Sequence, residues 1–341
     1  MPGKRPTAAD PTAQASRTPR PPADIPLAAL RRGSLVESVH RGRYVVCDSG
    51  GAVLDSGGDP DEPVWVRSSA KPFQALPLVA SGAADALGLT GEELAVVCGS
   101  HGGEEPHLTA VRSILRKAEM PEGALQSGAH PPLNVAAAGA LARLGETPRP
   151  IHGNCSGKHA GMLALCAYRG WETASYRDPD HPAQREILDA VRGMCGLGDE
   201  EILLGGDGCG APAFALPLRS LATGFARLSA GGSPGPFGEA AARVRRAMRE
   251  HPFMVAGTGR FDTRLMPRSE AVSKSGAEGV FAAGLPDGTG LAIKVSDGAG
   301  RAVEPAALSL LRRLGSGPMP EPETAVTDLH GAMVGSLGPL V

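Results

Sequence analysis

Apolar and polar residues alternate along the first part of the chain in the pattern of β-strands. Residues 34–39 alternate, residues 43–48 follow, and a Ser-Gly-Gly turn leads into residues 52–55, which predicts a hairpin. Residues 63–67 predict a further short strand that runs directly into residues 72–86, whose apolar positions recur at helical spacing. Strands that lead into a helix in this order predict a sheet flanked by helices.

The rest of the chain predicts helices separated by glycine-rich turns. Residues 90–97 begin with a threonine and carry acidic residues in the first turn, which is the pattern of a capped helix. Further helices are predicted at residues 104–119, 136–144, 162–166, 182–195, 216–229, 237–250 and 304–314. Further strands are predicted at residues 202–204, 280–282, 290–295 and 332–334.

The domain organisation predicted from this pattern is simple. The sequence shows no internal repeat and no clear linker, so we predict one catalytic domain over residues 26–341. Residues 1–25 are rich in Pro, Ala, Thr and Arg, which predicts a disordered leader. They contain no hydrophobic segment of the kind found in secretory signals. No apolar run approaches the roughly 18 residues needed to span a bilayer.

Composition narrows the choice of partner and compartment. The net charge of −2 over 341 residues gives no reason to expect nucleic acid or a membrane surface as partner. The six cysteines are expected to be thiols, most of them small buried hydrophobic residues, because the chain shows no export signal. The cytoplasm is therefore the expected compartment.

Ser68 and Lys71 form a Ser-x-x-Lys motif just ahead of the predicted helix at residues 72–86. If a helix begins here, the spacing of three residues places both side chains on the same helix face, about one turn from each other. An amine takes a proton from a serine only if burial or another cation keeps it partly neutral. The motif is that of the penicillin-binding and serine β-lactamase fold. The alternative for a single motif is an N-cap serine beside a solvated lysine.

Four glycine-rich polar loops and a fifth near the end of the chain suggest one shared cleft, because glycine lets the backbone approach a ligand closely. They are residues 67–71, 99–103, 152–161, 205–210 and 273–279. Three of them supply, in the order of the Ser-x-x-Lys fold, the motif itself, Ser100 on a turn between helices, and Lys274 in a Lys-Ser-Gly sequence before a strand. Without that context, Lys274 would be interpreted as a solvated loop lysine.

A second constellation joins the loop from Asn154 to His159 with Asp207 and Cys209. Two thiolates with an imidazole or an amine would form a nitrogen and sulfur site suited to zinc. The spacing contains no Cys-x-x-Cys pair, and two distant cysteines also fit a buried core. A lysine can be a ligand only as the neutral amine.

The chain resembles the second family of bacterial L-asparaginases, typified by rhizobial enzymes and unrelated to the threonine-nucleophile bacterial enzymes. The resemblance covers about residues 35–300. The matching blocks are Arg67-Ser68-Ser69-Ala70-Lys71-Pro72, Ser100-His101-Gly102-Gly103-Glu104, Asn154-Cys155-Ser156-Gly157-Lys158-His159, Gly206-Asp207-Gly208-Cys209 and Lys274-Ser275-Gly276-Ala277-Glu278-Gly279.

This resemblance implies an α/β (α+β) fold of the serine β-lactamase/glutaminase-like type, with a mainly antiparallel sheet flanked by helices. It implies a homodimer that hydrolyses L-asparagine to L-aspartate and ammonia. The implied catalytic pairs are Ser68 with Lys71 and Ser100 with Lys274. The implied zinc ligands are Cys155, Lys158 and Cys209, and the substrate-binding residues expected from the matching blocks are Arg67, His101, Gly102, Asn154, His159 and Asp207.

Alternative functions stay open at this point. One is a serine amidohydrolase that acts on another amide, either a glutaminase or a penicillin-recognising enzyme. The other is a zinc-binding relative that has lost catalysis. The sequence does not decide which serine is acylated, because both have a lysine as expected partner.

Overall fold

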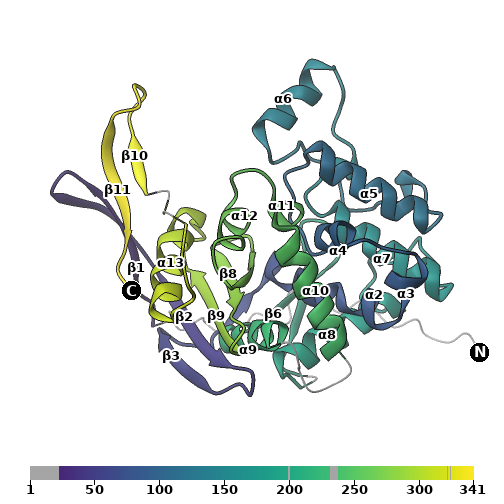
Figure 1. The fold of residues 1–341 in the computed structure, drawn as a ribbon, viewed down its shortest axis with the longest axis horizontal. Helices are drawn as coiled ribbons and strands as arrows, with labels where there is room; N and C mark the ends of the chain where they lie inside the picture. The colour runs from purple at the N-terminus through teal and green to yellow at the C-terminus, as the bar shows by residue number, and fades with distance from the viewer. Residues whose placement is uncertain (1–22, 199, 231–236, 321, 323) are drawn as a thin grey trace, which may run out of the picture.

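The computed structural model describes residues 23–198, 200–230, 237–320, 322 and 324–341. Most of the predicted leader, residues 1–22, and the predicted turn at residues 231–236 lie outside the described residues. The first strand, β1, begins at Ile25. Figure 1 shows the strands gathered on one side of the molecule and most of the helices on the other.

A curved antiparallel sheet forms the frame of the molecule. Its strands lie in the order β10-β11-β1-β2-β9-β8-β7, and β3 pairs with the far half of β2. The strands are β1 (Ile25–Arg32), β2 (Leu35–Asp48), β3 (Val53–Gly57), β7 (Val272–Ser275), β8 (Val280–Gly284), β9 (Thr289–Val295), β10 (Ala325–Thr327) and β11 (Met333–Pro339). A small antiparallel sheet is built from β4 (Pro63–Trp65), β6 (Pro212–Pro217) and β5 (Leu203–Gly206), in that order. The predicted fold class, a mainly antiparallel sheet flanked by helices, is confirmed.

A helix lies at each predicted position, but the one predicted at residues 162–166 spans Ser156–Arg169. The helices at Pro252–Ala256 and Phe261–Leu265 had no prediction. The helices are α1 (Lys71–Gln74), α2 (Leu76–Ala80), α3 (Ala83–Ala86), α4 (Gly91–Val97), α5 (Glu105–Lys117), α6 (Val135–Arg143), α7 (Ser156–Arg169), α8 (Pro182–Cys195), α9 (Leu218–Ser229), α10 (Gly238–Glu250), α11 (Pro252–Ala256), α12 (Phe261–Leu265) and α13 (Val303–Arg313). The single helix predicted at residues 72–86 is three short ones. Pro77 lacks the N–H that would continue the hydrogen-bond ladder, and Gly82 takes a left-handed φ of 83°.

The predicted strands differ from the observed ones in five places. Residues 34–39 and 43–48 belong to one continuous strand, β2, because neighbouring strands pair along its polar centre as well as its ends. β1, β6, β7 and β10 had no strand prediction. In β1 and β6 at least four consecutive residues are buried, so apolar and polar positions do not alternate there.

Two hydrophobic cores lie on opposite faces of the sheet. The larger one fills the space between the sheet and the helices α1 to α5 and α7 to α11, and the smaller one lies between the sheet and α13. α9 packs directly on strands β8 and β9. There a Cβ on Gly290 would lie only 2.0 Å from the carbonyl oxygen of Ala222, and one on Gly284 only 2.1 Å from that of Phe225. These two glycines face each other in the β8–β9 register, so they bring helix and sheet into backbone contact.

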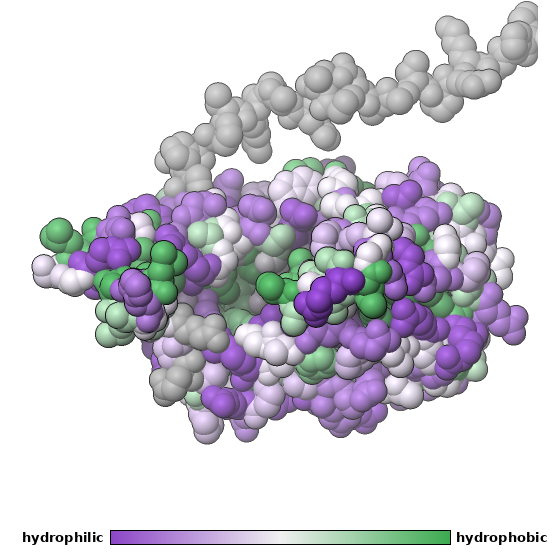
Figure 2. All heavy atoms as spheres, turned by 90° about the horizontal axis from the view of Figure 1, so that it is seen from above, coloured by the Kyte–Doolittle hydropathy of each residue, from purple (hydrophilic) through white to green (hydrophobic). Residues whose placement is uncertain are grey.

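Several large apolar side chains outside these cores are exposed, and four of them are at least 73% exposed at the β10–β11 hairpin and at α6. Leu329 and Met333 lie around the β10–β11 hairpin, and Val135 and Leu144 lie at the ends of α6. In the view of Figure 2, apolar surface gathers over the hairpin at the left and around α6 near the centre. The predicted homodimer stays a prediction. Among the described residues, no helix is long and apolar enough to cross a membrane.

Replacing Gly290 by alanine tests the close approach of α9 to the sheet. The added methyl group would lie 2.0 Å from the carbonyl oxygen of Ala222, so the helix must move away from β9. We expect a loss of about 1–3 kcal/mol or more in the free energy of unfolding, measured by urea denaturation. Gly338→Ala is the matched control, because nothing lies within 4 Å of that position. Equal stability of the two variants would contradict the packing described.

Candidate active site

The Ser-x-x-Lys motif lies on a sharp turn between the small sheet and the first helices. The turn consists of the 3₁₀-helix η1 (Arg67–Ala70), which follows β4 and continues into α1. Arg67 has a φ of 48°, a left-handed conformation that is costly for a residue with a side chain. The backbone N–H of Lys71 donates to the carbonyl of Ser68, so the two residues are one 3₁₀ turn apart. The predicted shared face of Ser68 and Lys71 follows from this spacing.

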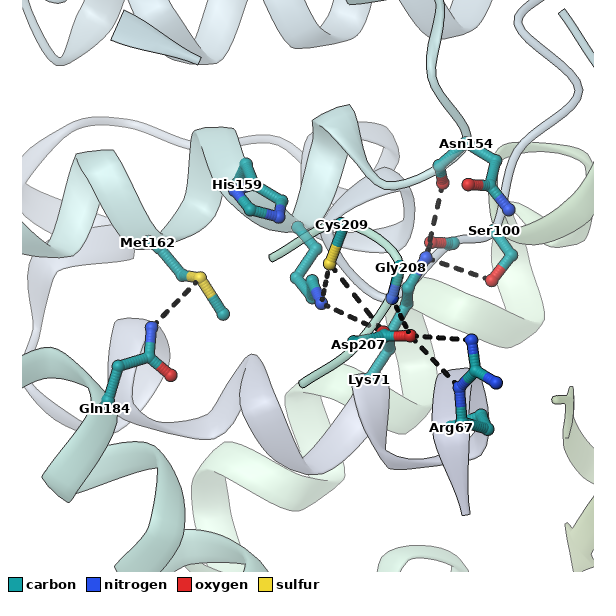
Figure 3. Close-up of polar contacts among 12 residues, drawn as sticks. Arg67, Lys71, Ser100, Asn154, His159, Met162, Gln184, Asp207, Gly208 and Cys209 are labelled. Atoms are coloured by element: carbon teal, nitrogen blue, oxygen red, sulfur yellow. Dashed lines mark hydrogen bonds and ion pairs between the residues drawn. The ribbon is translucent and has the colours of Figure 1, made fainter. Parts of the chain in front are cut away.

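Lys71 is buried and surrounded by oxygen atoms rather than by an acid. Its Nζ donates to the carbonyl of Gly99 at 2.5 Å, to Ser100 Oγ at 3.0 Å and to the carbonyl of Asn154 at 3.3 Å (Figure 3). Burial is the largest effect on the pKa of Lys71 and lowers it. The charge of Cys155 opposes this fall, and the charge of Lys158 adds to it. A buried amine with a lowered pKa is a proton acceptor in reach of a serine.

Close packing of two helices brings Ser100 and Asn154 to Lys71. α7 begins at Ser156, and a Cβ on Gly157 would lie 2.3 Å from the carbonyl oxygen of Val96 at the end of α4. The loop after α4 and the loop before α7 therefore run side by side, and the N–H of His101 donates to the carbonyl of Asn154 at 3.3 Å. The glycines of these loops serve helix packing as well as access to the pocket.

Lys274 lies on β7, which ends the strand order of the main sheet on this side. Its side chain is fully buried, and its Nζ donates to the carbonyl of Ser275 at 2.7 Å. Burial lowers the pKa of Lys274 to about 7, although Asp262 opposes the effect. Ser69 ties this strand to η1, because its Oγ donates to the carbonyl of Lys274 at 3.0 Å.

Cys155, Lys158 and Cys209 form one buried cluster. Lys158 Nζ donates to Cys209 Sγ at 3.1 Å and lies 3.9 Å from Asp207. Burial alone would lower the pKa of Lys158, but the two cysteines and Asp207 raise it to about 12. A hydrogen bond between the two sulfur atoms lowers the pKa of Cys155, with help from Lys71, and raises that of Cys209. The pair therefore favours one thiolate, on Cys155.

The ion pair of Arg67 and Asp207 lies between η1 and the cluster of Cys155, Lys158 and Cys209. The guanidinium of Arg67 reaches Asp207 Oδ1 at 2.9–3.0 Å, which joins η1 to the loop after β5. Burial would raise the pKa of Asp207, but the charges of Lys158 and Arg67 and the N–H of Gly208 lower it. The carboxylate therefore stays ionised beside the pocket.

A pocket of about 220 Å³ opens among these groups. Its wall includes Arg67, Ser68, Asn154, Cys155, Asp207 and Cys209, together with Ser127, His130, Gly153, Gly208 and Ala277. Three larger hollows, of about 380, 410 and 770 Å³, contain none of the serines or lysines predicted to be catalytic. Ser68 is the predicted catalytic residue on the wall of the small pocket, whereas Lys71, Ser100 and Lys274 are absent from that wall.

The contacts within this group differ from the expected Ser-Lys pairs. Lys71 is bonded to Ser100, and within the described residues no hydrogen bond joins Ser68 to Lys71 or Ser100 to Lys274. The two implied pairs are thus adjacent parts of one cluster, and their assignment stays a prediction.

Three predicted substrate-binding residues are absent from the pocket wall that the described residues form. His101 is buried, with Nε2 3.0 Å from Ser156 Oγ, and its Nδ1 accepts from the N–H of Gly103. His159 is buried against Tyr176 at 2.7 Å. Gly102 accepts from the N–H of Asn134. Their predicted contact with substrate stays untested, and in this structure they support the loops that carry the pocket.

Some residues of the site were not predicted from the sequence. His130 has no motif around it, yet its Nε2 accepts from the N–H of Asn154 at 3.1 Å. Ser127 and Ala277 also line the pocket. Only Ala277 had a local signal, since it follows the Lys-Ser-Gly sequence directly.

The chain is similar to known proteins over most of its length. The family model described as L-asparaginase II matches residues 28–336. A comparison with curated protein sequences gives no match. Among solved structures, Mglu in its native form is 17% identical, and the alignment covers 83% of this chain and 66% of that one with a TM-score of 0.37. The chain thus spans slightly less than two thirds of Mglu.

Two further solved structures are similar at the same level. Mglu in its tris and glutamate form is 16% identical, with 85% of this chain and 63% of that one covered and a TM-score of 0.39. The probable glutaminase ybaS is 16% identical, with 81% of this chain and 86% of that one covered and a TM-score of 0.37.

Replacing Lys274 by methionine tests the buried amine through stability. The unfolded chain holds the lysine proton up to a pKa near 10.5, whereas the folded chain releases it at about 7. Between these values the unfolded state binds more protons, so this group makes the free energy of unfolding rise by about 1.4 kcal/mol per pH unit. We therefore expect the free energy of unfolding of Lys274→Met, measured by urea denaturation at several pH values, to rise less steeply with pH than that of the wild type. The wild-type chain at the same pH values is the control, and an unchanged slope in Lys274→Met would refute the assignment.

Proposed function

The chain belongs to the L-asparaginase II family, and we propose that this amidohydrolase converts L-asparagine to L-aspartate and ammonia through a serine nucleophile. The observation that supports the proposal is a small pocket lined by Ser68 and Asn154, with the buried amine of Lys71 bonded to Ser100 and to the carbonyl of Asn154. A serine that attacks an amide needs a base within reach, and buried lysines with lowered pKa values supply it.

Ser68 is the better candidate for the nucleophile. It lines the pocket and is half-buried, whereas Ser100 is buried and absent from the pocket wall. In the first step Ser68 Oγ bonds to the side-chain carbonyl carbon of asparagine, and its proton passes to neutral Lys71. The C–N bond then breaks, and the proton reaches the leaving nitrogen through the cluster of Lys71, Ser100 and Lys274, which gives ammonia and an aspartyl ester. Water hydrolyses the ester and restores the serine.

Two backbone N–H groups are candidates for stabilising the oxyanion. Among the described residues, the N–H groups of Ser68 and Ala277 have no hydrogen-bond partner, and both residues line the pocket. Ser68 belongs to η1 and Ala277 follows β7, two segments that Ser69 joins through its bond to Lys274. N–H donors fixed in this way stabilise negative charge without reorganisation.

The charges at the pocket suit a small zwitterion. Arg67 offers a guanidinium to an α-carboxylate, and Asp207 offers a carboxylate to an α-ammonium group. The volume of about 220 Å³ is below the range of roughly 300–1,000 Å³ typical of drug-sized ligands. Both features favour an amino-acid amide over a penicillin. Glutamine is one methylene longer than asparagine and remains the nearest competing substrate.

Cys155, Lys158 and Cys209 fit the predicted zinc ion. No group of three or more His, Cys, Asp or Glu residues is placed to hold a metal within the described part of the chain, so the set depends on the lysine. The three residues offer two sulfur atoms and one nitrogen, and zinc would bind Lys158 in place of the proton that the cysteines and Asp207 favour on its amine. When bound there, zinc would supply a fixed positive charge that orients the charged end of the substrate. The serine remains the nucleophile.

Replacing Ser68 by alanine tests the nucleophile. We expect kcat for ammonia release from asparagine to fall by about 10³-fold or more, because the other hydroxyl on the pocket wall, that of Ser127, is bonded to the carbonyl of Pro150. Ser229→Ala is the control, since that buried hydroxyl donates only to the carbonyl of Ala226 in α9. Activity retained in Ser68→Ala would refute the assignment.

The same reaction identifies the acylated serine directly. Mass mapping of acid-quenched wild-type enzyme should place the aspartyl ester on the peptide with Ser68, and an ester on Ser100 would reverse the two roles. Ammonia release from glutamine and cleavage of the chromogenic cephalosporin nitrocefin, measured beside asparagine, separate the alternative substrates. A folded chain that is inactive on all three but binds zinc would support the non-catalytic alternative.

Removing both sulfur atoms tests the metal site. We expect the Cys155→Ala/Cys209→Ala double variant to lose zinc that the wild type binds at one ion per chain, measured by elemental analysis after dialysis. Cys166→Ala is the matched control, because that buried thiol lies within α7. A double variant that still binds one zinc per chain would show that the ligands are elsewhere.

A further inference from the structure

Asp262 is a buried acid next to the catalytic cluster that the mechanism above does not use. It lies on α12 and only 1% of it is exposed. Its carboxylate accepts from Ser273 Oγ at 2.8 Å and from the backbone N–H of Ser275 at 3.0 and 3.1 Å. Ser273 and Ser275 are the residues on either side of Lys274. The carboxylate is thus bonded to both neighbours of the buried lysine.

These bonds give the N–H of Ser275, at the open edge of the sheet, a hydrogen-bond acceptor. β7 is the last strand in the sheet order of the described residues and pairs only with β8. An N–H on the outer side of such a strand has no strand to bond with. At Ser275 the carboxylate of Asp262 takes the place of that strand. The segment of β7 that carries Lys274 is therefore held from both sides, by β8 and by α12.

Asp262 also acts on the charge of the lysine. No ion pair joins the two side chains, because Lys274 Nζ donates to the carbonyl of Ser275 instead. The carboxylate nevertheless opposes the fall that burial causes in the pKa of Lys274. The other charged or titratable groups that affect this amine are Lys71 and Arg260, which favour its neutral form, and Cys155, which favours its charged form. Cys98, whose pKa burial raises to about 12, also lies within range of Lys274.

We propose that Asp262 is a positioning residue that fixes Lys274 on the edge strand and holds a share of it protonated at neutral pH. The inference rests on the proposed function, because it gives Lys274 the role of passing a proton to the leaving nitrogen. A lysine buried among two other cations would otherwise be neutral at that pH and have no proton to give. Asp262 supplies the negative charge without contacting the amine, so the amine stays free to exchange a proton with its neighbours.

The direct test is the titration of Lys274 in Asp262→Asn. Lysine side-chain NMR on the full chain, with the signal assigned by its absence in Lys274→Arg, gives the pKa without any assay of activity. We expect the pKa to fall by about one unit or more, because the charge that favours the ammonium form is gone. Glu304→Gln is the matched control, since it removes an acid that lines the same hollow as Asp262 but is paired with Arg264. An unchanged or raised pKa in Asp262→Asn would overturn the inference.

The kinetic readout separates positioning from general loss of stability. Asp262 does not line the small pocket, so we expect kcat to fall about tenfold or more with KM unchanged, and the inflection that Lys274 gives to kcat/KM to move to lower pH. A purely structural role would move neither the KM-to-kcat ratio nor the inflection. If Asp262→Asn does not fold, Ser273→Ala removes one anchor and keeps the charge. It should lower kcat by a smaller factor, and wild-type kcat in that variant would refute the positioning role.

The two proposals fail in different ways. A wild-type enzyme that releases no ammonia from asparagine or glutamine would refute the proposed function, whatever the pKa of Lys274. An active wild type whose Lys274 titrates identically in Asp262→Asn would leave the function intact and reject the role of Asp262.

Discussion

The burial of two lysine amines without an acid in contact is the constraint on which the site depends. Lys71 and Lys274 are at most 1% exposed, and their Nζ atoms donate to carbonyl and hydroxyl oxygens. Transfer of an ammonium group out of water is costly, so both amines favour the neutral form more than a solvated lysine does. A neutral amine can take a proton from a serine, and the fold provides this by placing both amines in its interior.

Lys158 shows that burial alone does not set the charge of a lysine side chain. It is as buried as the other two, yet its pKa is raised to about 12, because Cys209, Cys155 and Asp207 outweigh the cost of burial. One side-chain type therefore favours two different charge states within a single cluster. At Lys71 burial outweighs the opposing effect of the cysteines and the pKa is lowered, whereas at Lys158 the cysteines and Asp207 outweigh burial and the pKa is raised.

The backbone makes this arrangement possible through contacts that admit no Cβ. Gly157 allows α7 to rest on the end of α4, which brings the carbonyl of Asn154 to Lys71. Gly284 and Gly290 allow α9 to rest on the sheet that carries β7. Arg67 adds a left-handed turn that its ion pair with Asp207 helps to hold. The abundance of glycine in the sequence therefore serves close packing around the site as much as loop flexibility.

The sequence by itself determined the types of residue in the site and most of the local elements. The Ser68–Lys71 spacing, the loop with Ser100 and the Lys-Ser-Gly sequence at Lys274 were readable because each is a short motif with a fixed offset. Only the tertiary structure decided that Lys71 bonds Ser100, and that Asp262 holds the strand of Lys274. Those contacts join segments far apart in the chain, and hydrogen bonding and burial between such segments depend on how helices and strands pack, which local periodicity does not encode.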